Sequence, residues 1–143
     1  MIAKLPTIAL IAAAAAVPIA ALSAPAGTTS TAAGVYTGAQ ASEGAELYAG
    51  QCAMCHGAAL AGTNEIPTLV SGRFVGNWQG PLSALFDYIH RAMPQMAPAT
   101  LAPEDNARIV AFLLRQNGMP AGKTALPGDS KALKAIVLEP VKR

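Results

Sequence analysis

Residue types that bind haem and metals gather in one short stretch of this 143-residue chain. Cys52, Cys55 and His56 form the pattern Cys-x-x-Cys-His, in a sequence with only two cysteines and two histidines. At this spacing each thiol can add to one vinyl group of a haem, while the adjacent histidine binds the iron from one side. The motif therefore predicts one haem c, attached through Cys52 and Cys55, with His56 as an iron ligand.

Two other chemistries use the same residue types and remain alternatives. A redox-active Cys-x-x-Cys disulfide belongs to a strand–helix context within a βαβ unit, and no such pattern surrounds this motif. A zinc site needs four ligands, and the adjacent Cys55 and His56 make poor neighbours in a tetrahedral set. The full candidate zinc set would be Cys52, Cys55, His56 and His90.

The first residues have the features of an export signal. Lys4 precedes an apolar run over residues 5–22, and Ala24-Pro25-Ala26 fits the A-x-A cleavage pattern. We therefore expect a signal peptide over residues 1–26 and a periplasmic mature chain, which agrees with haem attachment outside the cytoplasm. The alternative is an uncleaved anchor, because the apolar run is just long enough to span a bilayer. Only then would the membrane be a partner.

Charge and length limit the function classes. The formal net charge is +2, and Lys4 would leave with the signal peptide. This balance is far from the basic footprint of nucleic-acid-binding proteins, so we expect no nucleic-acid partner. The mature chain has room for one small domain, and a haem would supply a large part of the apolar core of that domain.

Helical periodicity dominates the mature chain, and no alternating strand pattern is visible. Thr37 and Gln40 have capping-box spacing at the first helix, in which Gln40 would reach back to the Thr37 backbone. Residues 57–80 are predicted to be loop, and one helical turn is compatible with residues 130–134. Three main helices are predicted, over residues 38–50, 81–93 and 103–117.

The helical region is flanked by two segments of different composition. The small polar sequence GTTSTAAG predicts a flexible linker over residues 27–35. The proposed domain covers residues 36–120. Residues 121–143 form a proline-containing C-terminal extension that either packs on the domain or trails from it.

The order of these motifs resembles that of a class I c-type cytochrome over residues 36–120. The features that carry the resemblance are a Gly44-x-x-x-Tyr48 helix, the cysteine–histidine motif, Met93-Pro94 and a final helix with Ile109 and Phe112. Further details are closest to cytochrome subunits that accept electrons from periplasmic dehydrogenases. The resemblance implies an all-α cytochrome c fold, with three main helices and loops packed around one covalently bound haem.

The resemblance also implies roles for single residues. His56 would be the proximal iron ligand, oriented by the backbone carbonyl of Pro67, and Met93 would be the sixth ligand. Trp78 would reach a haem propionate, helped by Arg73; the alternative for Trp78 is an ordinary packed aromatic. Where the first and last helices cross, Gly44 and Tyr48 would meet Ile109 and Phe112.

Other methionines and His90 compete for the sixth position. Met96 shares a loop with Met93, but Pro94 restricts Met93 to extended backbone geometry, which favours Met93. Met54 lies between the anchoring cysteines and cannot reach the opposite haem face, and Met119 has the place of a packing side chain. We expect His90 to be a partly exposed surface histidine rather than an iron ligand.

A six-coordinate iron with histidine and methionine ligands leaves no open position for a substrate. The sequence therefore predicts a carrier of single electrons rather than an enzyme. The expected partners are redox proteins: a dehydrogenase as donor, and an oxidase or another cytochrome as acceptor. The alternative is a haem peroxidase or gas-binding sensor with a labile sixth ligand.

Overall fold

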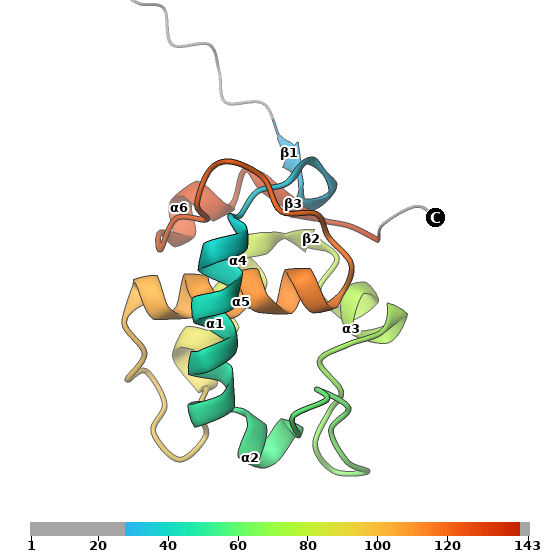
Figure 1. Ribbon diagram of the computed structural model, residues 1–143, viewed down its shortest axis with the longest axis vertical. Coiled ribbons are helices and arrows are strands. Elements are labelled where there is room, and N and C mark those ends of the chain that lie inside the picture. The colour runs from blue at the N-terminus through green and yellow to red at the C-terminus, as the bar shows by residue number, and fades with distance from the viewer. Residues whose placement is uncertain (1–27, 141–143) are drawn as a thin grey trace, which may run out of the picture.

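The computed structural model describes residues 28–140, which form a mainly helical domain (Figure 1). The signal peptide predicted over residues 1–26 lies outside the described residues. In chain order the elements are β1 (Thr29–Ser30), η1 (Thr31–Ala33), α1 (Gly38–Gln51), α2 (Ala53–His56), α3 (Gly72–Asn77), β2 (Gly80–Pro81), α4 (Leu82–Ala92), α5 (Pro103–Gln116), α6 (Ser130–Leu133) and β3 (Ile136–Leu138).

The three predicted main helices are α1, α4 and α5. Four of their six ends differ from the predicted bounds by one residue, and the other two agree. The Thr37 hydroxyl caps α1 by accepting the Gln40 backbone N–H at 3.1 Å, as the capping-box pattern predicts. The predicted hydrogen bond from the Gln40 side chain to the Thr37 backbone is wrong, because the Gln40 side chain bonds the backbone of Leu126 instead. Helix α5 begins at Pro103 with two acidic residues in its first turn, where they suit the helix dipole.

Helices α1 and α5 cross at Gly44 (Figure 1). A Cβ added at Gly44 would overlap the Arg108 carbonyl oxygen and lie 3.0 Å from Phe112 Cβ. The crossing therefore requires a residue without a side chain on α1. One turn further along, the rings of Tyr48 and Phe112 pack with their centroids 5.1 Å apart.

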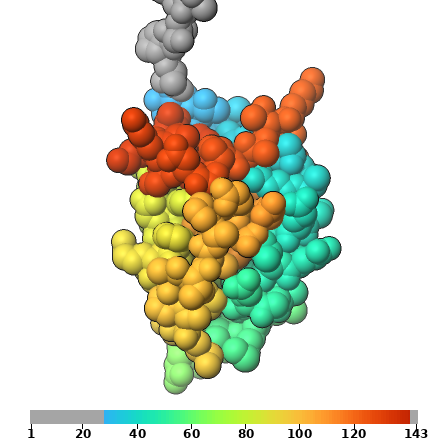
Figure 2. Space-filling model, turned by 90° about the vertical axis from the view of Figure 1, so that its left-hand side faces the viewer, coloured from blue at the N-terminus to red at the C-terminus, as the bar shows by residue number. Residues whose placement is uncertain are grey.

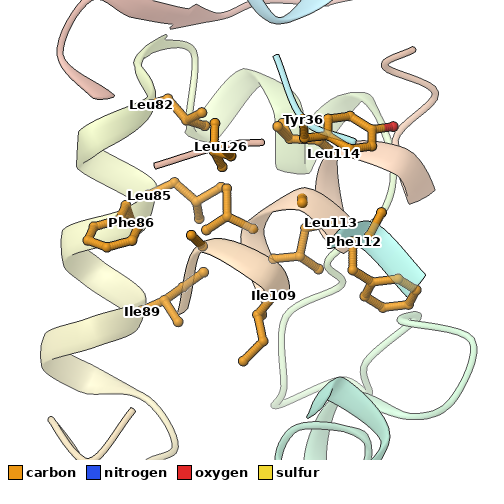
Figure 3. Packing of buried hydrophobic residues seen from close by; sticks show 14 of the residues in the cluster. Tyr36, Leu82, Leu85, Phe86, Ile89, Ile109, Phe112, Leu113, Leu114 and Leu126 are labelled. Atoms are coloured by element: carbon orange, nitrogen blue, oxygen red, sulfur yellow. The ribbon is translucent and has the colours of Figure 1, made fainter. Parts of the chain in front are cut away.

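The main hydrophobic core lies between α4 and α5 (Figure 3). Leu82, Leu85 and Ile89 form the apolar stripe of α4 and are buried, as the periodicity predicts. Ile109 and Leu113 of α5 are also buried. Outside this contact, Met119 is buried at the end of α5, where the Tyr36 hydroxyl donates to its carbonyl at 2.7 Å.

Residues 29–33 do not form the predicted flexible linker. Thr31 is fully buried, and the Thr29 backbone N–H donates to Ala135 O at 2.8 Å. Strand β3 lies between β1, which is parallel to it, and β2, which is antiparallel. The absence of strands was therefore also predicted wrongly, because strands of two or three residues are too short to show an alternating pattern.

The C-terminal extension packs on the domain rather than trailing from it. Figure 2 shows its residues covering one end of the molecule beside the N-terminal segment. Leu126, Leu133 and Leu138 are buried. The Gln40 side chain holds the backbone of Leu126 by two hydrogen bonds of 2.8 Å, and Ser130 donates to Asp87 of α4 at 2.9 Å.

The region over residues 57–80 is mostly loop, as predicted, but it contains the short helix α3. Six residues are too few to give a helical period in the sequence. Phe74 and Val75 are buried and hold α3 against the core. Within residues 28–140, none of the helices has the length and apolar character that crossing a membrane requires.

Candidate functional site

The cysteine–histidine motif lies at the opposite end of the domain from β1 (Figure 1): Cys52 joins α1 to the single-turn helix α2, which contains Cys55 and His56. The Cys52 backbone N–H donates to Tyr48 O at 2.9 Å, so the motif continues from the last turn of α1. The backbone N–H groups of Cys55 and His56 both donate to Cys52 O, at 3.1 and 3.0 Å. This single turn brings all three side chains onto one compact element.

Both cysteines are free thiols rather than a disulfide. Cys52 is half-buried, and Cys55 is exposed. Burial raises the pKa of the Cys52 thiol to about 11, and the charge of Cys55 adds to that rise. Redox-active Cys-x-x-Cys motifs instead lower a cysteine pKa to create a reactive thiolate, which the buried surroundings of Cys52 do not favour.

His56 is held in one orientation. Its side chain is buried, and its Nδ1 lies 3.0 Å from the backbone oxygen of Pro67. Because a carbonyl oxygen only accepts hydrogen bonds, Nδ1 carries the proton and donates it. The other ring nitrogen, Nε2, then keeps a lone pair that can bind a metal.

Gly62 shapes the loop that places the Pro67 carbonyl, a role that was not predicted from the sequence. Its φ is +66°, and an added Cβ would overlap Ile66 O and lie 2.7 Å from the Pro67 carbonyl carbon. The Gly62 backbone N–H donates to His56 O at 3.0 Å, which returns the loop to α2. The signal available in the sequence was a glycine in the loop directly after the motif, since glycine readily adopts a positive φ.

Two further side chains, Asn117 and Tyr48, tie the loop that follows the motif to the main helices. At the end of α5, Asn117 Nδ2 donates to Leu69 O at 2.9 Å, and its Oδ1 accepts the Ser71 backbone N–H at 3.1 Å. From α1, the Tyr48 hydroxyl donates to Gly57 O at 2.7 Å. Burial raises the pKa of Tyr48 to about 12, with a smaller contribution from Cys52, so this donor stays protonated.

The structure separates the four candidate methionines by their surroundings. Met93 follows the last turn of α4 in extended conformation, with φ −127° and ψ 148°, and packs half-buried against the core. Met96 is 85% exposed and Met54 80% exposed, while Met119 is buried in the core. Met93 is therefore the methionine whose position the fold constrains without burying it completely.

The remaining predicted site residues have less defined surroundings. Trp78 is half-buried and packs on Tyr88, with ring centroids 5.0 Å apart, as a packed aromatic would. Arg73 is exposed on α3. His90 is half-buried on α4, and its Nδ1 is a buried atom without a hydrogen-bond partner. These contacts do not connect Trp78, Arg73 or His90 to α2.

The donor set of the described residues suits a haem better than a zinc ion. Within residues 28–140, no three side chains of the types His, Cys, Asp and Glu converge as a metal-binding group. The chain instead offers two free thiols, an oriented imidazole at His56 and the fixed thioether of Met93. An imidazole and a thioether are axial ligands of haem iron in electron-transfer cytochromes.

Comparisons with known proteins give one family match. A family model described as cytochrome c oxidase, cbb3-type, subunit III matches residues 39–113. Among solved structures, the chain is similar to the sulfane dehydrogenase SoxCD from Paracoccus pantotrophus, with 30% sequence identity and a TM-score of 0.57. That match covers 74% of this chain and 53% of the SoxCD chain, so this chain spans about half the length of its relative. A comparison with curated proteins found no match.

The family match extends over more than half of the chain and includes α1, α2, α4 and most of α5. It contains Cys52, Cys55 and His56 at the spacing that covalent haem attachment requires. The mainly helical architecture agrees with the similarity to a solved structure. The chain therefore belongs to the class I c-type cytochromes, proteins of electron transfer that carry covalently bound haem c.

Proposed function

We propose that this cytochrome is a periplasmic carrier of single electrons, which passes them from a dehydrogenase to an oxidase or another cytochrome. The observation that carries the proposal is the contrast between Met93, held half-buried in extended conformation, and Met96, which is 85% exposed. A fixed thioether in the sixth position would leave no open site for a substrate. The protein would then transfer electrons without making or breaking bonds in a substrate.

Each site residue has one task in this proposal. Cys52 and Cys55 form the thioether bonds, and His56 Nε2 and Met93 bind the iron. The haem supplies a reversible one-electron change at its iron. The Pro67 carbonyl accepts a hydrogen bond from the His56 Nδ1–H, with Nδ1 and the oxygen 3.0 Å apart, which fixes the ring and raises the basicity of the ligand.

Trp78 and Arg73 are proposed to bind the haem carboxylates. The indole N–H is a donor without an acceptor role, and a guanidinium pairs well with a carboxylate. Trp78 is held by its contact with Tyr88, whereas Arg73 is exposed. Trp78 would therefore contribute a fixed hydrogen bond and Arg73 a more mobile charge.

The surface near the haem-attachment motif suits an uncharged partner. Residues 52–64 and 92–103 contain no Asp, Glu, Lys or Arg. Both segments expose a methionine, Met54 and Met96. Methionine is enriched in protein interfaces because its flexible thioether adapts to different surfaces. We therefore propose a weak, transient contact with a redox protein through these two segments.

The donor and the location rest on different observations. The similarity to the sulfane dehydrogenase SoxCD supports a dehydrogenase as electron donor. The signal sequence expected over residues 1–26 supports a periplasmic location, because haem is attached to Cys-x-x-Cys-His motifs outside the cytoplasm. A membrane contact would follow only from an uncleaved N-terminal segment.

The ferric absorption spectrum of the purified holoprotein tests the proposal. We expect a low-spin spectrum with the weak sulfur-to-iron band near the red end of the visible range. Met93→Ala should lose this band and lower the reduction potential, whereas the matched control Met96→Ala should keep both. A high-spin ferric spectrum of the wild type would instead support a peroxidase or gas sensor. Loss of the band in Met96→Ala alone would show that Met96 is the ligand.

A further inference from the structure

Two buried polar atoms of residues 28–140 have no hydrogen-bond partner: His90 Nδ1 on α4 and Asn106 Oδ1 on α5. Asn106 is completely buried, so its free oxygen faces the protein interior. Leaving a buried polar atom without a hydrogen bond is costly, and proteins satisfy the great majority of such atoms. These two atoms therefore require an explanation, and they belong to helices that pack on each other.

The contacts of Asn106 place it close to His90. Asn106 Nδ2 donates to Phe86 O at 2.9 Å. In an α-helix the same carbonyl accepts the backbone N–H four residues later, which is that of His90. Side chains on a helix also lean back toward the preceding turn, so the His90 imidazole extends over the turn that contains Phe86. From this helix geometry we expect His90 Nδ1 and Asn106 Oδ1 to lie on either side of the Phe86 carbonyl.

We propose that His90 Nδ1 and Asn106 Oδ1 are joined through one buried water molecule into a polar link between α4 and α5. Asn106 Oδ1 accepts a hydrogen bond from the water, and His90 Nδ1 forms the second hydrogen bond of that water. A buried water of this kind commonly bridges polar groups that the protein does not otherwise pair. The link would give both unpartnered atoms a hydrogen bond.

The link gives His90 a role as a positioning residue for Met93. His90 belongs to the last turn of α4, and the Met93 backbone N–H closes that turn by donating to Ile89 O at 2.9 Å. Fixing His90 to α5 fixes the point from which the Met93 segment leaves the helix. This consequence rests on the proposed function of Met93 as iron ligand, whereas the link itself does not.

A double-mutant cycle on the holoprotein tests the link. His90→Leu and Asn106→Leu should each lower the folding equilibrium constant about tenfold, because each leaves one buried polar partner unsatisfied. The double variant leaves neither partner of the link unsatisfied but still lacks the Asn106 Nδ2–Phe86 O hydrogen bond, so it should lose about tenfold rather than the hundredfold expected of independent sites. If the losses of the two single variants multiply in the double variant, the link does not exist.

A second set of variants tests the positioning role. His90→Asn keeps an amide near the place of Nδ1, and His90→Gln moves the amide to the place of Nε2. We expect the temperature at which the sulfur-to-iron band disappears to stay near that of the wild type in His90→Asn and to fall in His90→Gln and His90→Leu. The exposed neighbour Arg91→Leu is the control and should not lower it.

The outcomes separate the two proposals. A wild type that lacks the sulfur-to-iron band contradicts the proposed function of Met93 and leaves the mutant cycle as the test of the link. A wild type that shows the band, with equal thermal loss of the band in His90→Asn and His90→Leu, contradicts the positioning role of His90.

Discussion

Replacing Gly44 by alanine tests the helix crossing that leads into the haem-attachment motif. An added Cβ would overlap the Arg108 carbonyl oxygen and lie 3.0 Å from Phe112 Cβ, whereas unstrained carbon contacts lie at about 3.5–4.0 Å. Both neighbours belong to α5, and one of them is backbone, so the two helices must separate. Overpacking of this kind costs about 1–3 kcal/mol, and alanine regains about 0.5–1 kcal/mol of helix propensity.

We therefore expect Gly44→Ala to lower the free energy of unfolding by about 1–2 kcal/mol, which corresponds to a fall in Tm of about 4–8 °C for a domain of this size. Thermal unfolding of the ferric holoprotein, followed by circular dichroism, measures it. Gly50→Ala is the matched control on the same helix, since an added Cβ there meets nothing within 4 Å. Equal Tm values for the two variants would refute the close approach of α1 and α5.

Three further predictions address the loop, the extension and the partner surface. Gly62→Ala should lower the free energy of unfolding by about 1–3 kcal/mol, and by more than Gly57→Ala does. Both positions have positive φ, but only the Gly62 Cβ would collide with the loop. Equal losses for the two variants in urea unfolding would contradict this role of Gly62. Leu133→Ala should cost about 2–4 kcal/mol if the C-terminal extension is integral to the fold, and a loss under about 0.5 kcal/mol would mean that the extension detaches readily. Because residues 52–64 and 92–103 carry no charges, the electron-transfer rate with the partner should change less than about threefold between low and physiological ionic strength; a steep fall in stopped-flow rates would contradict uncharged docking.

The sequence was sufficient to predict the elements with strong local signals. The apolar stripe of Leu82, Leu85 and Ile89 identifies α4, and Pro103 with its acidic neighbours marks the start of α5. The spacing of the cysteine–histidine motif favours haem attachment over the redox and zinc alternatives. Such features depend on residues a few positions apart, which sequence patterns report directly.

The features that the sequence did not predict depend on partners far along the chain. Thr31 is buried because it meets the backbone of Glu139, and Gln40 bonds Leu126 instead of completing its capping box. Strands β1 and β2 exist only because β3 lies between them. A window of neighbouring residues contains no information about such pairings, so a small polar segment was interpreted as a linker.

The candidate site was predicted unevenly for the same reason. The motif itself is local, and the proximity of Pro67 to His56 followed from family resemblance rather than from the residues alone. The role of Gly62 in shaping that loop and the buried polar atoms of His90 and Asn106 become visible only in three dimensions. The predicted haem contact of Trp78 and Arg73 stays a proposal, because Trp78 packs on Tyr88 and Arg73 is exposed.

The central claim is that one haem is covalently bound through Cys52 and Cys55, and the intact mass of the denatured protein tests it most directly. Full-length chain should be exported from cells that contain a cytochrome c maturation system, then purified and measured under denaturing conditions. We expect the mass to exceed that of the polypeptide by one haem, and Cys55→Ala to reduce this species sharply. A mass equal to that of the polypeptide alone, or undiminished haem attachment in Cys55→Ala, would contradict it.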